Sequence, residues 1–222
     1  ILGPRINAGG RVGKCSHGAN LLLNNNPKES FQIATELEKY NSERKKLEKD
    51  LLNVALNTIN KNINDPVLVL HGNHWHEGII GIIASRLKDK FNKPTIIISL
   101  NNKIGKASAR SILGFDIGSI ILAAVQNKLL IKGGGHKMAG GFSIEENKIE
   151  QFKEFIIKKF KTKIDKNLFK NTLFLDSSIS SSALNLDFYQ KIEKLSPFGP
   201  GNPEPKFILE NLKVIKSLVI GE

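Results

Sequence analysis

Short apolar runs alternate with longer amphipathic segments between Val67 and Phe160. In the longer segments the apolar residues recur every three or four positions, as in a helix that buries one face. Strands that alternate with helices are typical of an α/β layer domain. We therefore predict strands over 67–70, 95–98, 106–112 and 141–144, and helices over 78–91, 116–128 and 147–160. The expected fold class is α/β with a mixed sheet.

A long helical pattern precedes this domain. Asn26, Pro27 and Glu29 make a helix start, with a capping side chain, Pro at the first helical position and an acid in the first turn. Apolar residues then recur at helical spacing to about residue 62, where Asp65-Pro66 follows and breaks the helix. The pattern predicts one long connecting helix over 27–64, or two helices in line. The charged residues within 43–50 are expected to form a solvated face.

The two ends of the chain have different patterns. Residues 1–26 are interpreted as loop and short helix. Beyond about residue 167 the pattern indicates β structure, with a rigid, turn-rich segment over Pro197–Pro205. Strands are expected at 173–175, 207–209 and 212–219, and a helix over 186–195. The predicted organisation is therefore four parts, over residues 1–26, 27–64, 65–165 and 166–222.

Positive charge narrows the class of partner. The chain has 33 Lys and Arg residues against 21 Asp and Glu, a formal net charge of +12 over 222 residues. Such an excess favours binding to polyanions, above all nucleic acids. The alternative is a basic surface that only keeps the protein in solution. Lys outnumbers Arg and Asn is abundant, so compositional bias accounts for part of the excess.

Several classes of protein are excluded or disfavoured by composition. Cys15 is the only cysteine, which rules out an intrachain disulfide framework and a cysteine-rich zinc site. The chain has no apolar run near the roughly 20 residues that span a bilayer and no visible signal peptide. We expect a cytoplasmic protein with no membrane partner. The chain starts at Ile1 and ends just after an apolar run, so we also expect a fragment of something larger.

The segment Gly133–Phe142 holds five glycines around His136 and Lys137. Glycines let backbone N–H groups approach an anion, and His and Lys side chains can donate hydrogen bonds to it. A phosphate-binding loop is the interpretation we favour. The alternative is a mobile turn between two strands, because glycine-rich runs commonly mark turns.

Two further clusters combine small residues with cationic side chains, over 7–11 and 106–111. Arg11 and Arg110 could each bind a phosphate through two parallel hydrogen bonds, and Ser108 and Ser111 offer hydroxyl groups. In a strand, Lys106, Ser108 and Arg110 would share one face because side chains alternate. No acidic residue lies between Lys103 and Gly114, which favours phosphate binding over an ordinary solvated surface.

Metal and catalytic constellations are harder to find. His71, His74 and His76 have spacings that zinc or manganese could accept, but they lie at a strand-to-helix junction, where His more often packs or caps. An anion at the following helix N-terminus is a further possibility. The Asp residues are scattered, whereas a two-metal nuclease needs converging carboxylates. The residues thus predict phosphate binding without a complete catalytic apparatus.

Taken in order, these clusters resemble the RecJ family, single-strand-specific 5′→3′ DNA exonucleases of the DHH phosphoesterase superfamily. Pro4–Arg11 resembles the end of the catalytic DHH domain, and His76–Leu87 resembles the opening of the DHHA1 domain. Ser108–Ser111 and Gly133–Phe142 resemble DHHA1 substrate-binding motifs, and Pro197–Pro205 resembles the beginning of the RecJ OB-fold. The glycine–histidine motif is shared with oligoribonucleases and other DHHA1 proteins, whereas the long helix and Pro197–Pro205 favour RecJ.

The resemblance implies a hydrolase of DNA repair and recombination that uses Mn²⁺ or Mg²⁺. Its metal ligands are expected in the Asp-His-His motif of the DHH domain, which this chain lacks, so the fragment alone is expected to be inactive. Arg11, Ser108, Arg110 and His136 would contact DNA phosphates, Gly134 and Gly135 would let the backbone approach, and His136 would polarise the scissile phosphate.

The resemblance to the RecJ family implies a domain identity for each of the four parts. Residues 1–26 would end the DHH domain, 27–64 would connect, 65–165 would be DHHA1, and 166–222 would begin the OB-fold and extend the path of the strand. Single-stranded DNA is the implied partner, with a single-strand-binding protein or a helicase as further candidates. Two alternatives stay open: an oligoribonuclease or nucleotide phosphoesterase of the same superfamily, and a non-catalytic nucleic-acid-binding fragment.

Overall fold

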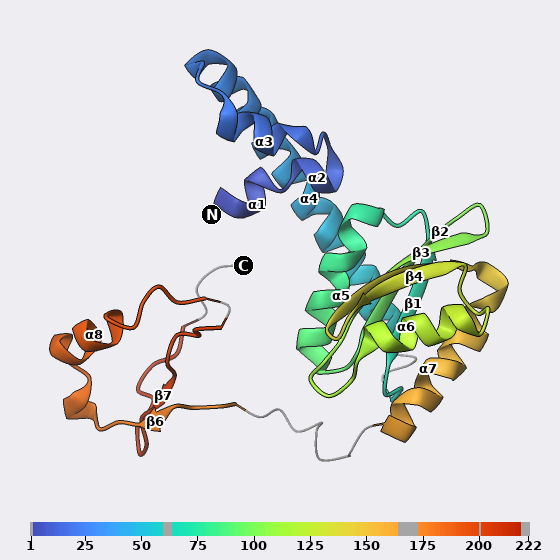
Figure 1. Ribbon diagram of the computed structural model, residues 1–222. Coiled ribbons are helices and arrows are strands. Elements are labelled where there is room, and N and C mark those ends of the chain that lie inside the picture. The colour runs from blue at the N-terminus through green and yellow to red at the C-terminus, as the bar shows by residue number, and fades with distance from the viewer. Residues whose placement is uncertain (1, 60–63, 164–172, 200, 219–222) are drawn as a thin grey trace. The chain divides into compact units, whose positions relative to one another are not determined.

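The computed structural model describes residues 2–59, 64–163, 173–199 and 201–218 (Figure 1). The chain divides into two compact units, residues 1–169 and 170–222. Among the described residues, the first unit holds a bundle of helices and a five-stranded sheet, and the second holds a short strand pair, one α-helix and a 3₁₀ turn. No helix among the described residues is long and apolar enough to cross a membrane.

Three short helices precede the long one: α1 (Leu2–Ile6), α2 (Gly9–Val12) and α3 (Ser16–Leu23). The segment is therefore more helical than the loop and single short helix expected from its glycines. Small residues allow close packing here, because a Cβ at Gly13 would meet the ring of Tyr40 and one at Gly18 would meet the carbonyl oxygen of Ile6. Burial against α4 outweighs the weak helix propensity of glycine.

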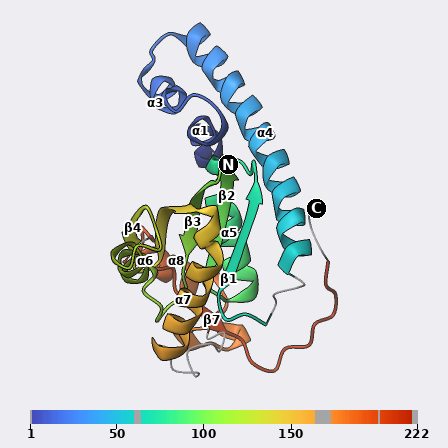
Figure 2. The same cartoon turned by 90° about the vertical axis from the view of Figure 1, so that its right-hand side faces the viewer.

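The connecting element is one helix, α4 (Pro27–Ile59), which Figure 2 shows as a single long rod. The Asn26 Oδ1 atom accepts hydrogen bonds from the backbone N–H groups of Lys28 at 3.0 Å and Glu29 at 3.4 Å, so the predicted cap is confirmed. The buried stripe of α4 consists of Leu37, Asn41, Glu48, Leu51, Ala55 and Ile59.

The expectation of a solvated charged face over 43–50 is wrong at Glu48, whose side chain is only 3% exposed. Arg44 Nη1 donates to Glu48 Oε2 at 2.6 Å, and Arg86 of α5 (Glu77–Phe91) forms an ion pair with Glu48 Oε1. Arg44 Nη2 also donates to Asn41 Oδ1 at 3.1 Å. Two arginines compensate the buried carboxylate, which therefore ties α4 to α5.

Five strands form the sheet of the first unit, in the order β1-β2-β3-β5-β4 (Figure 1). Strand β1 pairs with β2 in parallel and all other pairs are antiparallel, so the predicted mixed sheet is confirmed. Their bounds are β1 Leu68–Asn73, β2 Thr95–Asn101, β3 Ile104–Arg110, β4 Lys132–His136 and β5 Ala139–Glu145.

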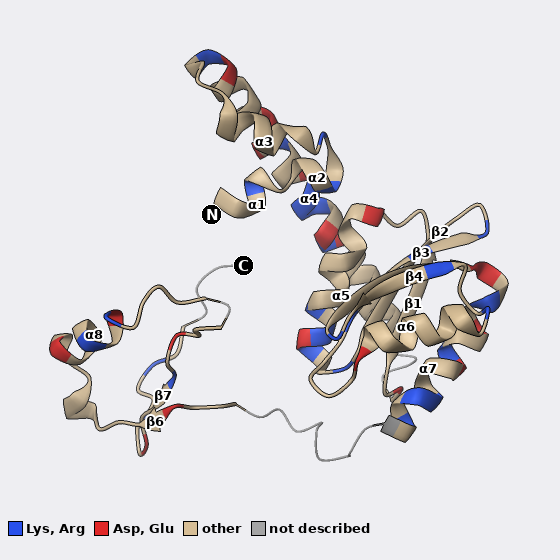
Figure 3. Cartoon of the chain, viewed as in Figure 1, with Lys and Arg blue, Asp and Glu red and all other residues tan. Residues whose placement is uncertain are grey.

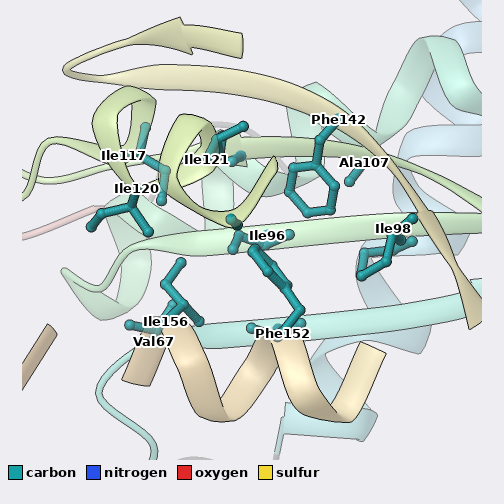
Figure 4. Packing of buried hydrophobic residues seen from close by; sticks show 14 of the residues in the cluster. Val67, Ile96, Ile98, Ala107, Ile117, Ile120, Ile121, Phe142, Phe152 and Ile156 are labelled. Atoms are coloured by element: carbon teal, nitrogen blue, oxygen red, sulfur yellow. The ribbon is translucent and has the colours of Figure 1, made fainter. Parts of the chain in front are cut away.

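Each face of the sheet has its own core. On one face, α4 and α5 cover β1 and β2 through a cluster that includes Leu51, Leu70, Ile83 and Ile97. On the other face lie α6 (Ile117–Gln126) and α7 (Ile149–Lys163), the latter after a 3₁₀ turn over Glu146–Lys148. Figure 4 shows this second core, in which α6 and α7 pack on Val67, just before β1, and on the strand residues Ile96, Ile98, Ala107 and Phe142.

The glycine-rich segment is a β-hairpin, so its backbone matches the alternative of a turn between two strands rather than the favoured loop. Strands β4 and β5 pair from Lys132↔Ser143 to His136↔Ala139, leaving only Lys137 and Met138 at the turn. The backbone groups between these ends are in register with a partner strand, and β5 in turn pairs with β3. Ladder hydrogen bonding and packing under α6 overcome the low strand propensity of glycine.

The second unit contains the parallel pair β6 (Ser177–Ser178) and β7 (Phe207–Ile208), with α8 (Leu186–Glu193) between them and a 3₁₀ turn at Ser181–Ala183. Phe188 packs edge-on against Phe207, with ring centroids 5.2 Å apart. Residues 173–175 and 212–218 do not form the predicted strands. Val214, Ile215 and Leu218 are exposed, so that run lacks the burial that would support a strand. Residue 219 lies outside the described residues.

The α4–α5 ion-pair cluster gives a stability prediction. Replacing Glu48 by Ala should lower the free energy of unfolding by about 3 kcal/mol, because it leaves the partly buried Arg44 without its counter-charge. Glu43→Ala, an exposed position on the same helix, should change it by less than about 0.5 kcal/mol. Urea unfolding followed by circular dichroism measures both values. Equal effects of the two substitutions would show that burial of Glu48 does not matter.

Candidate phosphate-binding face of the sheet

Strand register brings the polar residues of three strands onto one face. Paired residues of a sheet point to the same side, and every second residue along a strand repeats that side. Three rows therefore cross β3, β5 and β4: Arg110–Ala139–His136, Ser108–Gly141–Gly134, and Lys106–Ser143–Lys132. We call these nine residues the open face.

On this face, helix α5 packs over β2 and β3. A Cβ on Gly81 of α5 would lie 3.1 Å from Ser108 Oγ and 3.2 Å from Arg110 Nη2, so these β3 side chains lie against the helix. Beyond them, a Cβ at Gly134 would meet nothing within 4 Å. At Gly141 it would meet only the carbonyl oxygen of Ala107, at 3.4 Å. In the middle row, the floor over β5 and β4 is therefore bare backbone.

The glycines of the hairpin divide between the two faces. A Cβ at Gly133 or Gly140 would lie 2.7 or 2.4 Å from the Ile121 side chain of α6, so both positions need glycine for packing. A Cβ at Gly135 would lie 2.3 Å from the carbonyl oxygen of Ala139 within the hairpin. Gly135 thus serves the hairpin itself and points away from the open face, unlike Gly134.

Arg110 and Arg11 lie close together without an acid. The pKa of Arg110 is lowered, first by burial and then by the positive charge of Arg11. Arg110 Nη1 donates to Ser108 Oγ at 3.2 Å and to its neighbour, the Ala109 carbonyl, at 2.9 Å. Among the described residues no carboxylate forms an ion pair with either arginine. Two guanidinium groups held together in this way create a site for an anion.

A close backbone contact places Arg11 at this site. A Cβ at Gly78, near the start of α5, would lie 2.0 Å from the Arg11 carbonyl oxygen, so only glycine lets α2 approach α5 so closely. Helix α5 itself has few free donors at its N-terminus. Gly78 N–H donates to His76 Nδ1 at 3.1 Å, and the N–H groups of Ile79 and Ile80 donate to the His76 carbonyl.

His76 is therefore a helix cap, as its position at the strand-to-helix junction suggested. Among the described residues, no three His, Cys, Asp or Glu side chains converge as a metal ion would require. The described residues do not fit a metal centre, so any metal-dependent step has to use other ligands. Ser111 is also structural, because it is buried and its hydroxyl donates to the Phe115 carbonyl.

His136 lies at the hairpin tip, in the same row as Arg110. Its Nδ1 accepts a hydrogen bond from the Met138 N–H at 3.3 Å. In neutral imidazole one ring nitrogen accepts and the other carries the proton, so Nε2 is the donor. The exposed ring can therefore donate to an anion without first being protonated.

The structure brings Arg11, Ser108, Arg110, Gly134 and His136 to one region, as the sequence predicted for phosphate binding. Four members of the open face were missed as site residues: Lys132, Ala139, Ser143 and Gly141. A hairpin interpretation of 132–145 would have found them, because alternation from Gly134 places Lys132 and His136 on its side. Opposite charges mix along α4 and α7 (Figure 3), whereas the three rows of the open face contain only basic and neutral residues.

The part of the chain that forms this sheet and its helices matches a known domain class. Residues 64–162 match the DHHA1 domain and residues 175–222 match the RecJ OB domain. The chain is 32% identical over its whole length to the RecJ single-stranded-DNA-specific exonuclease of Salmonella typhimurium, and 31% identical to that of Escherichia coli. It spans 40% of the length of each of these relatives.

A solved structure supports the same assignment. RecJ of Thermus thermophilus in complex with Mn²⁺ superimposes with a TM-score of 0.81 at 28% identity, over 94% of this chain and 30% of that one. A second structure of the same protein contains Mg²⁺. This chain is thus a DHHA1-domain protein. It belongs to the RecJ family, whose C-terminal DHHA1 and OB part it matches.

The two faces of the hairpin predict opposite outcomes for two neighbouring glycines. Gly133→Ala should lower the free energy of unfolding by about 1–3 kcal/mol, because the methyl group overpacks against Ile121 and Phe142. Gly134→Ala should leave it unchanged or raise it by about 0.5 kcal/mol, because the site is open and alanine restricts the unfolded chain. Thermal or urea unfolding compares them. A larger loss at Gly134 would contradict the face assignment.

Proposed function

We propose that the open face, with Arg11 beside it, binds the phosphates of single-stranded DNA. The observation that carries this proposal is the packing of the Arg11 backbone against Gly78 and of the Arg110 guanidinium against Gly81, one turn further along α5. Among the described residues no carboxylate forms an ion pair with either arginine. Bringing two guanidinium groups together and partly burying one of them opposes folding, so an anion that binds both relieves the repulsion. A phosphate diester has the geometry for such contacts.

The bare backbone at Gly134 and Gly141 suits a ligand that lies flat on the sheet. Without side chains there, a phosphate or a sugar can approach the strands directly. Ser108 Oγ and His136 Nε2 then add neutral donors on either side of this floor. In this proposal His136 binds and polarises a phosphate oxygen, which would stabilise negative charge that develops there during cleavage.

We further propose that the chain supplies the substrate-binding part of a single-strand-specific 5′→3′ exonuclease active in repair and recombination. The relatives named above are RecJ exonucleases, and the RecJ OB match favours this reading over an oligoribonuclease. The domain limits 1–26, 27–64, 65–165 and 166–222 belong to the same proposal, as do a cytoplasmic location and a single-strand-binding protein or helicase as partner.

A cleavage assay tests whether this chain binds single-stranded DNA without hydrolysing it. We expect the purified 222-residue chain to bind an oligodeoxynucleotide at low salt and to leave it uncleaved in Mn²⁺ or Mg²⁺, because the described residues hold no metal centre. Electrophoresis of a 3′-labelled single strand after incubation with each ion measures cleavage, and a RecJ relative serves as the positive control. Robust Mn²⁺-dependent digestion by the chain would contradict this proposal.

Arg110 is the residue to change for binding. Arg110→Ala should weaken binding of single-stranded DNA at least about tenfold, the loss of one charge-assisted contact. Its melting temperature should not fall, because the substitution also removes the repulsion by Arg11. Arg110→Lys should retain part of the affinity, since it keeps the charge without the bidentate geometry. Fluorescence anisotropy and thermal unfolding measure the two effects. Unchanged affinity with a lowered melting temperature would make Arg110 a structural residue.

A further inference from the structure

The third row of the open face, Lys106–Ser143–Lys132, is separate from the arginine pair. Along β3, Lys106 lies four residues from Arg110, which corresponds to about 13 Å in an extended strand. Both lysines of the row are exposed, and Ser143 between them is half-buried and offers a hydroxyl group. The row therefore presents two cations and a neutral donor across three neighbouring strands.

We propose that this row is a second phosphate subsite, which binds the backbone of a nucleotide further along the same DNA strand. The inference rests on the proposed function and extends it. A strand whose first phosphate lies at Arg110 and His136 crosses the bare floor at Gly134 and Gly141 to reach Lys106 and Lys132. A second subsite would make the chain prefer ligands with several phosphates over a mononucleotide.

Charge around the row defines its limits. In the next row beyond it, Ile104 pairs with Glu145, and the Glu145 carboxylate lies 3.4 Å from Lys148 Nζ. That carboxylate ends the basic strip on the side away from Arg110. Across β2, the row continues to Ser99, which is buried and donates its hydroxyl to the Trp75 carbonyl. The subsite is thus confined to the three strands β3, β5 and β4.

Lys106 forms an ion pair with Glu77. Lys106 Nζ lies 2.8 Å from Glu77 Oε2, with side chains 61% and 45% exposed. An exposed ion pair of this kind contributes only about 0–1 kcal/mol, so a phosphate can replace the carboxylate. Glu77 also lies in the first turn of α5, where the helix dipole stabilises its charge after Lys106 leaves. Glu77 therefore acts as a competing anion that lowers the affinity of the subsite.

Two ligands separate the subsites: thymidine 5′-monophosphate and the 5′-phosphorylated trinucleotide of thymidine. Lys106→Gln and Lys132→Gln should each weaken trinucleotide binding about threefold to tenfold and leave mononucleotide binding unchanged. Each should also reduce the salt slope for a longer strand by about 0.7, the value for one phosphate contact on a single strand. Glu77→Gln should strengthen trinucleotide binding about twofold to fivefold by freeing Lys106.

The control is Lys158→Gln, an exposed lysine of α7 on the opposite side of the sheet. It removes the same charge and should change neither affinity. Equal weakening of both ligands by Lys106→Gln, or no weakening of the trinucleotide, would overturn the second subsite. A Glu77→Gln variant with unchanged affinity would overturn the competing role of Glu77. If the unmodified chain binds neither ligand, the proposed function itself fails, which is a distinct result.

Discussion

The contact between Ile121 of α6 and the glycine hairpin is the constraint on which the site depends. The side chain lies where a Cβ at Gly133 or Gly140 would be, so α6 sits directly on the backbone of β4 and β5. With α6 and α7 covering that side, no helix within the described part of the chain covers the opposite side of the same strands. The packing of one face thus creates the exposed floor of the other, and the alternation of strand residues carries Lys, Ser, Arg and His onto it.

A second close backbone contact, between α2 and α5, determines the charge around Arg110. The Arg11 carbonyl lies against Gly78, which brings a helix from the start of the chain next to the start of α5. Arg110 then shares its surroundings with Arg11, and no carboxylate among the described residues pairs with either. The buried carboxylate of Glu48 holds α4 to α5 through Arg44 and Arg86, and so supports the same arrangement from further away. Arginines are thus compensated where helices meet and left uncompensated where the substrate is proposed to bind.

Elements with local signals were predictable. The Asn26 cap and Pro27 specify the start of α4, and the apolar periodicity of 78–91 and 147–160 specifies two helices, because these preferences act within a few residues. The strand over 141–144 was predicted within β5, but β4 was missed because glycine has no strand preference of its own. The strands of this hairpin exist through pairing with β3 and packing under α6, which are contacts between distant residues. Burial of Glu48 was missed for a similar reason, since one partner, Arg86, lies on another helix.

The sequence by itself determined the α/β class, the long connecting helix, the basic character and the residue types of the proposed phosphate site. Those properties follow from composition, periodicity and local motifs. Only the tertiary structure decided which glycines lie on the open face and which face α6, and that Arg11 lies beside Arg110. It also added Lys132 and Ser143 to the face and excluded Ser111 from it. The physical reason is that a face is defined by register and packing between strands, which no single segment of the chain specifies.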